Sequence, residues 1–279
     1  MKNKTILITG GTGSLGQAIV KLLLSLDAQK IIVFSRDEFK QVDMKRTIED
    51  PGHKVRYFIG DVRDRDRLNR AFIGVDYVIH CAALKHVDAG EYNPSEFVKT
   101  NVFGAQNIID AALDSGVKKV LGVSSDKAVN PISLYGATKL CADKLFVAAN
   151  AYSGKLGTKF SVIRYGNFIG SRGSVVPYWQ ELKERGENII PVTDPEMTRY
   201  WITLEDAALR AFEALEDMVG GEIYVPKMEQ RKIVDVAREI HPKAIFEYIG
   251  KRKGEKIHEE IVPDWDDVKE RGNLWVTAS

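Results

Sequence analysis

Short apolar runs rich in β-branched residues alternate with longer amphipathic stretches along the first half of the chain. We expect strands at Thr5–Thr9, Lys30–Phe34, Val55–Ile59, Tyr77–Cys81 and Lys119–Ser124. We expect helices between them at Gly16–Leu26, Arg65–Phe72 and Glu96–Ser115. Continuous apolar strands separated by helices are typical of a parallel sheet that is covered on both faces. The alternation therefore predicts an α/β fold with a doubly wound parallel sheet.

The second half of the chain is less regular. A helix is expected at Leu134–Asn150 and a sixth strand at Phe160–Arg164, but beyond Asn167 glycine and proline interrupt the pattern. Further helices are expected at Val176–Arg185 and Leu204–Met218. We predict a dinucleotide-binding domain over residues 1–166. Residues 167–279 are predicted to form a smaller substrate-binding lobe that is interleaved with it, with an approximate boundary.

Composition disfavours several classes of protein. The 279 residues include 40 basic and 39 acidic ones, a net charge of +1, which argues against binding nucleic acid or membrane surfaces through general charge. No apolar run approaches the roughly 20 residues that span a membrane, and no signal-peptide pattern follows Met1. Cys81 and Cys141 are expected to be reduced thiols, so we expect a cytoplasmic protein.

A glycine-rich turn reads T-G-G-T-G-S-L-G from Thr9 to Gly16, directly after the first expected strand and before a helix. Such a turn lets backbone N–H groups approach a pyrophosphate at a helix N-terminus, which is typical of a Rossmann-like sheet. A turn without a ligand is the alternative, and the placement between strand and helix disfavours it. The residues expected to bind the dinucleotide here are Gly10, Thr12, Gly13, Ser14, Leu15 and Gly16.

The end of the second strand indicates which dinucleotide is bound. A site that prefers NAD usually has an acid there for the ribose 2′-hydroxyl. Here Ser35, Arg36 and Asp37 follow Phe34, with Lys40 one turn on, so cations are available for a 2′-phosphate and we predict NADP. The alternative is that Arg36 and Lys40 are solvated and Asp37 serves NAD. Further residues expected beside the cofactor are Asp61, Val62, Ala82, Ala83 and Lys85.

The segment 124–139 reads S-S-D-K-A-V-N-P-I-S-L-Y-G-A-T-K and carries the candidate chemistry. Tyr135 and Lys139 are four residues apart and share one helix face. A phenol titrates near ~10, so we expect the Lys139 ammonium to lower the pKa of Tyr135 enough for it to act as a base. Asp126 and Lys127 are further proton carriers. A surface ion pair or a helix cap is the alternative for these two.

These features resemble an extended short-chain dehydrogenase/reductase. The resemblance narrows to the inverting UDP-N-acetylglucosamine 4,6-dehydratases of pseudaminic acid biosynthesis, and it covers the chain to about residue 260. The motifs that carry it are S-R-D-E-x-K-Q (35–41), G-D-V-R-D (60–64), A-A-L-K-H-V (82–87), S-D-K-A-x-N-P (125–131), R-Y-G-N (164–167), S-R-G-S-V (171–175), M-T-R-Y-W-I (197–202) and G-E-K-I-H-E (254–259). The family usually has proline after A-L-K-H-V, where this chain has Asp88.

The resemblance implies a dehydration that involves a transient oxidation. Tyr135 takes the C4 hydroxyl proton while hydride leaves C4, and Lys139 also holds the nicotinamide ribose. Lys127 then removes the C5 proton, which requires a depressed pKa, and Asp126 protonates the departing C6 hydroxyl. Hydride returns to C6, and C5 is reprotonated on the opposite face. Ser125 is included among the catalytic residues, although turn hydrogen bonding is an equal alternative for it.

A UDP-sugar requires cations and polar groups, and the resemblance places these largely beyond residue 166. The expected substrate-binding residues are Lys85, Ser124, Ser125, Asn167, Arg172, Gly173, Ser174, Thr198, Arg199, Arg252 and Glu255. No metal is predicted, because His80 and His86 lack partners at ligand spacing. The family implies a homo-oligomer, with a hexamer as one possible form. Rival readings are a sugar-nucleotide 4- or 5-epimerase and a catalytically silent NADP(H)-binding regulatory protein.

Overall fold

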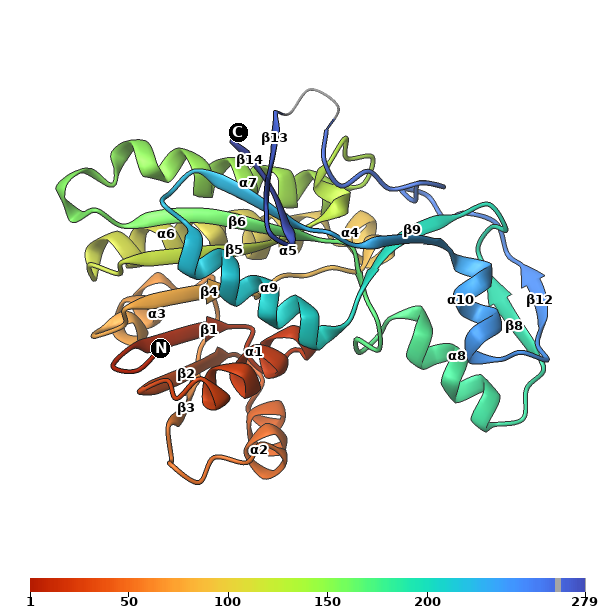
Figure 1. The fold of residues 1–279 in the computed structure, drawn as a ribbon, viewed down its shortest axis with the longest axis horizontal. Helices are drawn as coiled ribbons and strands as arrows, with labels where there is room; N and C mark the ends of the chain where they lie inside the picture. Colours follow the sequence, from red (N-terminus) through yellow and green to blue (C-terminus); the bar gives the residue numbers. More distant parts are fainter. Residues whose placement is uncertain (264–266, 279) are drawn as a thin grey trace.

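The computed structural model describes residues 1–263 and 267–278. Its parallel strands are β1 (Thr5–Thr9), β2 (Lys30–Ser35), β3 (Val55–Ile59), β4 (Tyr77–His80), β5 (Lys119–Ser125), β6 (Lys159–Tyr165) and β10 (Glu222–Pro226). The antiparallel strands β14 (Leu274–Ala278) and β13 (Val268–Arg271) follow β10 at one edge. The nine strands lie in the order β13-β14-β10-β6-β5-β4-β1-β2-β3 (Figure 1). This arrangement confirms the doubly wound α/β fold.

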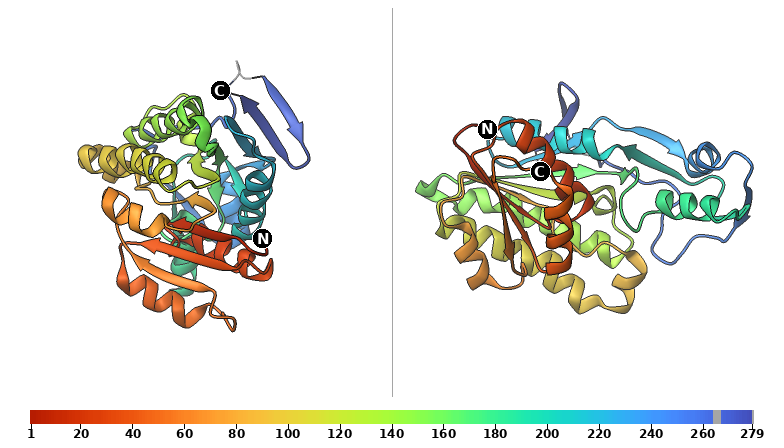
Figure 2. Two further views of the ribbon diagram at one scale, coloured as in Figure 1. Left: turned by 90° about the vertical axis from the view of Figure 1, so that its left-hand side faces the viewer. Right: turned by 90° about the horizontal axis from the view of Figure 1, so that it is seen from below.

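Helices cover both faces of this sheet (Figure 2). Side chains alternate across a strand, so Ile6 and Ile8 of β1 pack on one face while Leu7 packs on the other. One face is covered by α1 (Ser14–Ser25), α2 (Glu38–Thr47) and α9 (Leu204–Asp217). The other is covered by α3 (Arg65–Phe72), α6 (Gly104–Asp114) and α7 (Leu134–Tyr152). Burial on both faces explains why these strands are apolar throughout.

Helix α2 was not expected from the sequence. Its side chains Phe39 and Val42 are exposed, whereas Gln41 and Met44 are buried, so its apolar residues do not follow the usual helical period. Polar contacts specify it instead. The Gln41 amide donates to the Ser35 carbonyl and hydroxyl oxygens at the end of β2.

The single helix expected at Glu96–Ser115 is interrupted. The structure has α5 (Pro94–Phe97), a π-helical turn at Val98–Phe103 and then α6. In this turn the Asn101 side chain bonds the Leu84 backbone N–H and carbonyl, both at 2.9 Å, and the Thr138 hydroxyl at 3.0 Å. These contacts tie the segment after β4 to α7 at the place where the helix takes its π-helical turn.

A smaller lobe lies beside the main sheet (Figure 1). It contains α8 (Val175–Glu184), α10 (Ile233–Ile240) and the parallel pair β8 (Ile189–Val192) and β12 (Ile245–Tyr248). Its core includes Trp179, Met197 and Trp201. A second small sheet joins it to the main body through β7 (Asn167–Phe168), β9 (Thr198–Ile202) and β11 (Glu229–Lys232).

The chain beyond residue 166 therefore contributes to both parts of the molecule. Helix α9 packs on the same face as α1, and β10 pairs with β6 through Ile223 and Tyr224. The strands β13 and β14 extend the main sheet from this side. In the part of the chain that the structure describes, no helix is both long enough and apolar enough to cross a membrane.

Candidate active site

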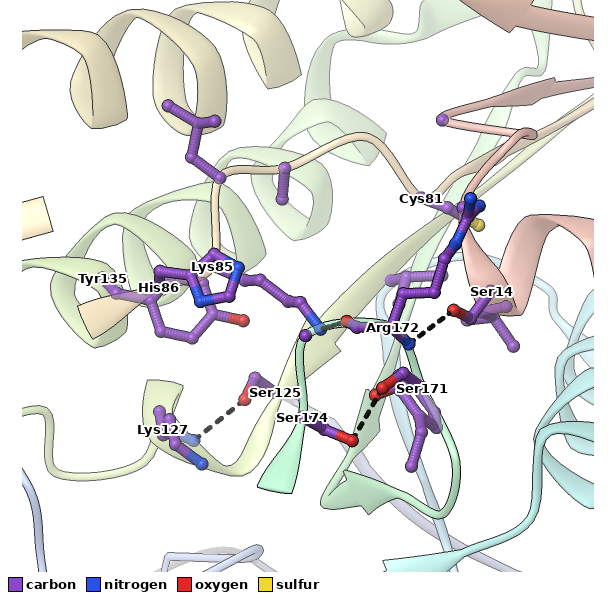
Figure 3. A pocket seen from close by; sticks show the side chains of 18 of the residues that line it. Ser14, Cys81, Lys85, His86, Ser125, Lys127, Tyr135, Ser171, Arg172 and Ser174 are labelled. Atoms are coloured by element: carbon purple, nitrogen blue, oxygen red, sulfur yellow. Dashed lines mark hydrogen bonds between the residues drawn. The ribbon is translucent and has the colours of Figure 1, made fainter. Parts of the chain in front are cut away.

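A cavity of about 860 Å³ lies at the carboxyl ends of the parallel strands, where the main body faces the smaller lobe. Ligands of open α/β sheets bind at this end of the strands. Figure 3 shows Tyr135, Ser125 and Lys127 on one side of this cavity and Ser14 and Arg172 on the other. Segments that are remote in the sequence therefore share one site.

The glycine-rich turn forms one end of the cavity. Gly10 has φ +64°, and a Cβ there would lie 2.8 Å from the Ala82 backbone nitrogen. A Cβ on Gly16 would lie 2.6 Å from the Gly11 Cα, so only glycine allows the turn to close on α1. Thr12, Gly13, Ser14 and Leu15 also line this end of the cavity, together with Gly10 and Gly16.

The N-terminus of α1 is suited to a pyrophosphate. It has no side-chain cap and no acid in its first turn, whereas the side chain of Asp37 caps α2. The first N–H groups of a helix lack acceptors within the helix and carry partial positive charge. The uncapped end and the glycine contacts therefore fit a dinucleotide at this position.

The predicted cofactor residues at the end of β2 and just after it all line the cavity, but several already have partners; they are Ser35, Arg36, Asp37 and Lys40. The Ser35 hydroxyl accepts from Gln41 at 3.1 Å, and Asp37 accepts from the Lys40 backbone N–H at 3.0 Å. The Lys40 ammonium lies 3.0 Å from the Asp37 carboxylate. Asp37 is therefore engaged in capping α2 and in pairing with Lys40.

Arg36 extends toward the end of β3, where its guanidinium lies 3.6 Å from Asp61. Burial acts to raise the pKa of Asp61, but hydrogen bonds from Arg63 and the charge of Arg36 hold that pKa below its usual value. Asp61 therefore stays ionised beside two cations. The other predicted cofactor residues in this part of the wall are Val62, Ala82, Ala83 and Lys85.

Tyr135 and Lys139 lie in the first turns of α7. The Ser133 hydroxyl caps this helix by accepting from the Gly136 N–H at 3.1 Å. A Cβ on Gly136 would lie only 2.2 Å from the Lys127 carbonyl oxygen, so α7 packs directly on the turn that carries Asp126 and Lys127. This contact brings the two halves of the 124–139 segment to one place.

The expected effect of Lys139 on Tyr135 is wrong for this structure. Burial raises the pKa of Tyr135, and the nearby Ser125 hydroxyl and the charge of Lys127 oppose that shift. The Lys139 ammonium donates to the Val123 carbonyl at 2.6 Å. Burial also lowers the pKa of Lys139, against the opposing charge of Asp143. The cation that assists the Tyr135 phenolate in this geometry is thus Lys127.

Asp126 is fully buried behind Ser125 and Lys127 and is not part of the cavity wall. Its Oδ1 accepts from the Ser125 hydroxyl at 2.8 Å and from the Lys127 ammonium at 3.1 Å. Its Oδ2 has no hydrogen-bond partner within the described residues. Ser125 does line the cavity, so a proton could pass between Asp126 and a bound molecule through its hydroxyl.

The expected depression of the Lys127 pKa is also wrong. Burial acts to lower this pKa, but the carboxylates of Asp126 and Glu259 more than offset that effect and raise it. The Glu259 Oε1 lies 3.5 Å from the Lys127 ammonium. Glu259 was missed as a site residue, although it ends the G-E-K-I-H-E motif.

The predicted substrate residues divide into three groups. Asn167, Gly173, Ser174, Glu255 and Ser124 line the cavity together with Lys85 and Ser125. The arginines Arg172, Arg199 and Arg252 also line it but are already bound to protein groups. Thr198 does not line it, because its hydroxyl is 2.8 Å from His258 Nδ1 and accepts from Gln230 at 3.0 Å.

Each arginine has a distinct partner. The Arg172 guanidinium donates to the Thr12 carbonyl, and the backbone N–H of Arg172 donates to the Ser14 hydroxyl at 3.0 Å. Arg199 donates to the carbonyls of Lys256 and Ile257 at 2.9 and 3.0 Å. Arg252 lies 3.1 Å from Asp88. Arg172 thus contacts the glycine-rich turn, and Arg199 supports the chain that precedes Glu259.

No group of three or more His, Cys, Asp or Glu side chains that could hold a metal ion occurs in the described ranges, 1–263 and 267–278.

The strand order, the glycine-rich turn and the Tyr135–Lys139 pair define an extended short-chain dehydrogenase/reductase. The chain belongs to the family described as "Polysaccharide biosynthesis protein", whose model matches residues 6–274.

Two curated relatives illustrate the range of activities in this group. The UDP-N-acetylglucosamine 4,6-dehydratase (inverting) of Campylobacter jejuni is 52% identical over 94% of this chain and 78% of its own length. The UDP-glucose 4-epimerase of Rickettsia akari is 39% identical over 96% of this chain and 80% of its own.

Solved structures agree with the fold. The structure of Pen from Bacillus thuringiensis has a TM-score of 0.95 at 38% identity and covers all of this chain and 88% of its own. DesIV, the dTDP-glucose 4,6-dehydratase from Streptomyces venezuelae with NAD and TYD bound, has a TM-score of 0.83 at 25% identity, covering 93% and 88%.

Proposed function

We propose that this protein is a C5-inverting UDP-N-acetylglucosamine 4,6-dehydratase, a carbon–oxygen lyase. The observation that carries the proposal is the packing of α7 on the Asp126–Lys127 turn, which places Tyr135 beside an acid and an amine. An oxidoreductase that only moves hydride needs the tyrosine and its lysine. The additional acid and amine suit an elimination. The identity to the Campylobacter jejuni dehydratase supports the choice of substrate.

We propose that residues 1–166 form the cofactor-binding domain and that 167–279 supply the substrate lobe, with α9 and β10 returning to the main sheet. The cavity then holds the dinucleotide at the glycine-rich turn and the sugar nucleotide between Tyr135 and the lobe. Asn167, Ser174 and Glu255 offer polar contacts for the substrate, and Arg252 offers a cation for its diphosphate.

In the first step Tyr135 removes the C4 hydroxyl proton, assisted by Ser125 and by the positive charge of Lys127. Lys139 would hold the nicotinamide ribose. A bound nicotinamide dinucleotide supplies the hydride acceptor for C4 and the hydride donor for C6. The C4 ketone that results makes the C5 proton acidic.

In the second step Lys127, once neutral, removes the C5 proton, and Asp126 supplies the proton for the departing C6 hydroxyl. Because Asp126 lies behind the cavity wall, Ser125 passes this proton forward through its hydroxyl. After hydride returns to C6, a proton from solvent is added to the opposite face of C5, and Tyr135 releases to solvent the proton that it took from the C4 hydroxyl. The net reaction is loss of water with inversion at C5.

We also propose NADP rather than NAD as the cofactor. The Arg36 side chain is 55% exposed at the cavity edge and can reach a 2′-phosphate, whereas Asp37 is engaged by α2 and Lys40. Binding constants for both dinucleotides test this, with tighter NADP⁺ binding that Arg36→Ala selectively weakens as the expected result. Equal or tighter binding of NAD⁺ contradicts it.

The family resemblance further supports the proposals that the protein is a homo-oligomer, that it acts in the cytoplasm and that its product enters pseudaminic acid biosynthesis. Light scattering of the purified protein measures the oligomeric state. Conversion of the product by the next enzymes of that pathway tests the metabolic assignment.

A 4-epimerase is the second candidate, favoured by the 39% identity to the Rickettsia akari enzyme. Incubation with UDP-N-acetylglucosamine in D₂O followed by NMR separates the two reactions. A dehydratase yields a 4-keto-6-deoxy sugar with deuterium at an inverted C5. An epimer that keeps its C6 hydroxyl would establish the second candidate instead.

A further inference from the structure

Glu259 lies in the cavity wall, and the steps above give it no task. It is buried, and its Oε1 is 3.5 Å from the Lys127 ammonium. Its Oε2 is also buried and has no hydrogen-bond partner among the described residues, with the Lys256 ammonium 4.0 Å away. A buried carboxylate oxygen without a hydrogen bond is costly to keep charged. The arrangement therefore points to a carboxylate that can accept a proton and become neutral.

The fold holds Glu259 in place from the lobe. The Arg199 guanidinium donates to the carbonyls of Lys256 and Ile257, and the Thr198 N–H donates to Ile257 at 3.1 Å. A β-bridge between Thr198 and His258 continues this attachment to β9. The residue next in the chain is Glu259, so the position of its carboxyl group is set by strand β9 and not by a free loop.

The charged groups that face Glu259 are Lys127, Asp126, Arg199 and Lys256. Burial raises the pKa of Glu259, and the positive charge of Lys127 opposes this. The two carboxylates in turn raise the pKa of Lys127. With the cavity open to water, Lys127 is therefore an ammonium ion and cannot accept a proton from C5.

Filling the cavity changes this balance. A bound sugar nucleotide displaces water, and loss of water disfavours charge on both partners, lowering the pKa of a lysine and raising that of a glutamate. Asp126 is already assigned the proton for the departing hydroxyl. Glu259 is then the remaining acid group within reach of the Lys127 ammonium.

We propose that Glu259 is the proton partner of Lys127, taking the ammonium proton once substrate fills the cavity and C4 has been oxidised, and so releasing the amine that deprotonates C5. This inference rests on the proposed dehydratase function. Glu259 acts through Lys127 and is therefore a positioning residue for the protonation state of the base.

The proton and electron balance is complete. An N–H bond of Lys127 breaks and an O–H bond forms on Glu259. The amine lone pair then takes the C5 proton, the C5–H electron pair becomes the C5–C6 double bond, and the C6–O bond breaks as Asp126 supplies a proton through Ser125 to give water. Asp126 enters this step protonated and leaves it as a carboxylate. When product leaves, Glu259 returns its proton to solvent and Asp126 takes one back through Ser125, while Lys127, which holds the proton from C5, is again an ammonium ion.

The test is the Glu259→Gln variant of the full chain with NADP⁺ and UDP-N-acetylglucosamine in D₂O. We expect deuterium incorporation at C5 to fall about 100-fold or more, the range for loss of an acid–base group. Oxidation at C4 continues, so reduced nicotinamide accumulates and can be followed by its absorbance. The matched control is Glu260→Gln, because Glu260 is exposed and bonds Asn130 instead.

Other outcomes overturn the inference. C5 exchange that is unchanged or faster in Glu259→Gln shows that Glu259 only holds Lys127 protonated. An equal loss of C4 oxidation and C5 exchange shows a structural role. If Glu259→Gln does not fold, as judged by its melting temperature and NADP⁺ affinity, Glu259→Asp replaces it. In that variant a pH profile of C5 exchange identical to the wild-type profile contradicts the inference, and a displaced profile supports it.

The wild-type protein supplies the reference that separates the two proposals. If it neither dehydrates UDP-N-acetylglucosamine nor exchanges its C5 proton, the proposed function fails. If the wild type does both and Glu259→Gln matches it, only the role of Glu259 fails.

Discussion

In the proposed reaction, Lys127 is the residue that most directly distinguishes elimination from simple hydride transfer. Replacing it with methionine keeps the length of the side chain and removes the amine. We expect Lys127→Met to lose C5 deuterium exchange by about 100-fold or more while C4 oxidation is still detectable. Lys144→Met is the control, since Lys144 is exposed on the same helix as Tyr135. Full dehydratase activity in Lys127→Met would refute its assignment as the base.

His80 makes the stability of the protein depend on pH. It is buried at the end of β4 with its Nδ1 2.7 Å from the Thr9 hydroxyl, and burial lowers its pKa from 6.5 to about 3. Between these values the unfolded chain binds a proton that the folded chain does not. The contribution to stability is therefore complete above the unfolded pKa and declines as the pH falls toward the folded pKa, by about 1.4 kcal/mol per pH unit.

The measurement is urea unfolding across this pH range. His80→Asn keeps an acceptor for the Thr9 hydroxyl and removes the titrating ring. We expect the free energy of unfolding of His80→Asn to vary less steeply with pH than that of the wild type. The two slopes should differ by the equivalent of about one bound proton, whatever the absolute stability of the variant. An unchanged slope would show that other groups cause the acid sensitivity.

At the level of elements, the contact between α7 and the Asp126–Lys127 turn carries a direct prediction. In Gly136→Ala the new Cβ would lie 2.2 Å from the Lys127 carbonyl oxygen. The backbone fixes the positions of both atoms, so a side-chain rotation cannot relieve the clash. The helix and the turn must then separate. Because misplacing a catalytic group by about 1 Å can cost about 100-fold in rate, we expect a loss of that order.

Gly52→Ala is the matched control, because its Cβ would meet only the flexible Lys54 side chain at 3.2 Å. Cofactor affinity should be nearly unchanged in both variants, since the glycine-rich turn is elsewhere. Dehydratase activity of Gly136→Ala within a few-fold of the control would show that this packing does not determine the position of Tyr135.

The elements that were predictable from sequence are those whose own residues specify them. The strand Thr5–Thr9 and the helix Arg65–Phe72 have the expected bounds, because buried apolar runs and an Asp64 cap mark them locally. Helix α2 depends on the amide of Gln41 reaching back to β2, and the π-helical turn depends on Asn101 reaching Leu84. The hydrophobic periodicity of the sequence gives no sign of such polar contacts between neighbouring elements.

The same distinction holds for the site. The glycine-rich turn and the Tyr135–Lys139 pair are local patterns, and the cavity includes both. Glu259 reaches Lys127 only because Arg199 fastens residues 256 and 257 to β9, and sequence spacing gives no sign of this. The pKa directions of Tyr135 and Lys127 were mispredicted for a related reason, since they depend on burial and on charges from distant segments.

At the scale of the whole molecule, Asp88 and Arg252 link the main body to the lobe across the cavity. Their charged groups are 3.1 Å apart and more than half exposed, so the pair contributes at most about 1 kcal/mol. A substrate diphosphate would compete with Asp88 for Arg252. We expect Asp88→Asn to lower the KM for UDP-N-acetylglucosamine by up to about fivefold with little change in kcat.

Arg252→Ala is expected to raise the KM for UDP-N-acetylglucosamine. That result would show that Arg252, and not the shape of the loop, causes the change in KM in Asp88→Asn. A KM for Asp88→Asn equal to or above the wild-type value would show that Asp88 orients Arg252 for the substrate instead of competing with it.

The path of the chain between the two parts has a consequence for engineering. It leaves the main sheet after β6, comes back as α9, leaves again after β10 and comes back as β13. A fragment ending near residue 166 would expose the edge of β6 that β10 covers and the face of α1 that α9 covers. The lobe therefore cannot be exchanged as one cassette. A chimera designed to have another enzyme's sugar specificity needs compatible junctions at every point where the chain passes between the main body and the lobe. Helix α9 and strand β10 should be kept from the recipient.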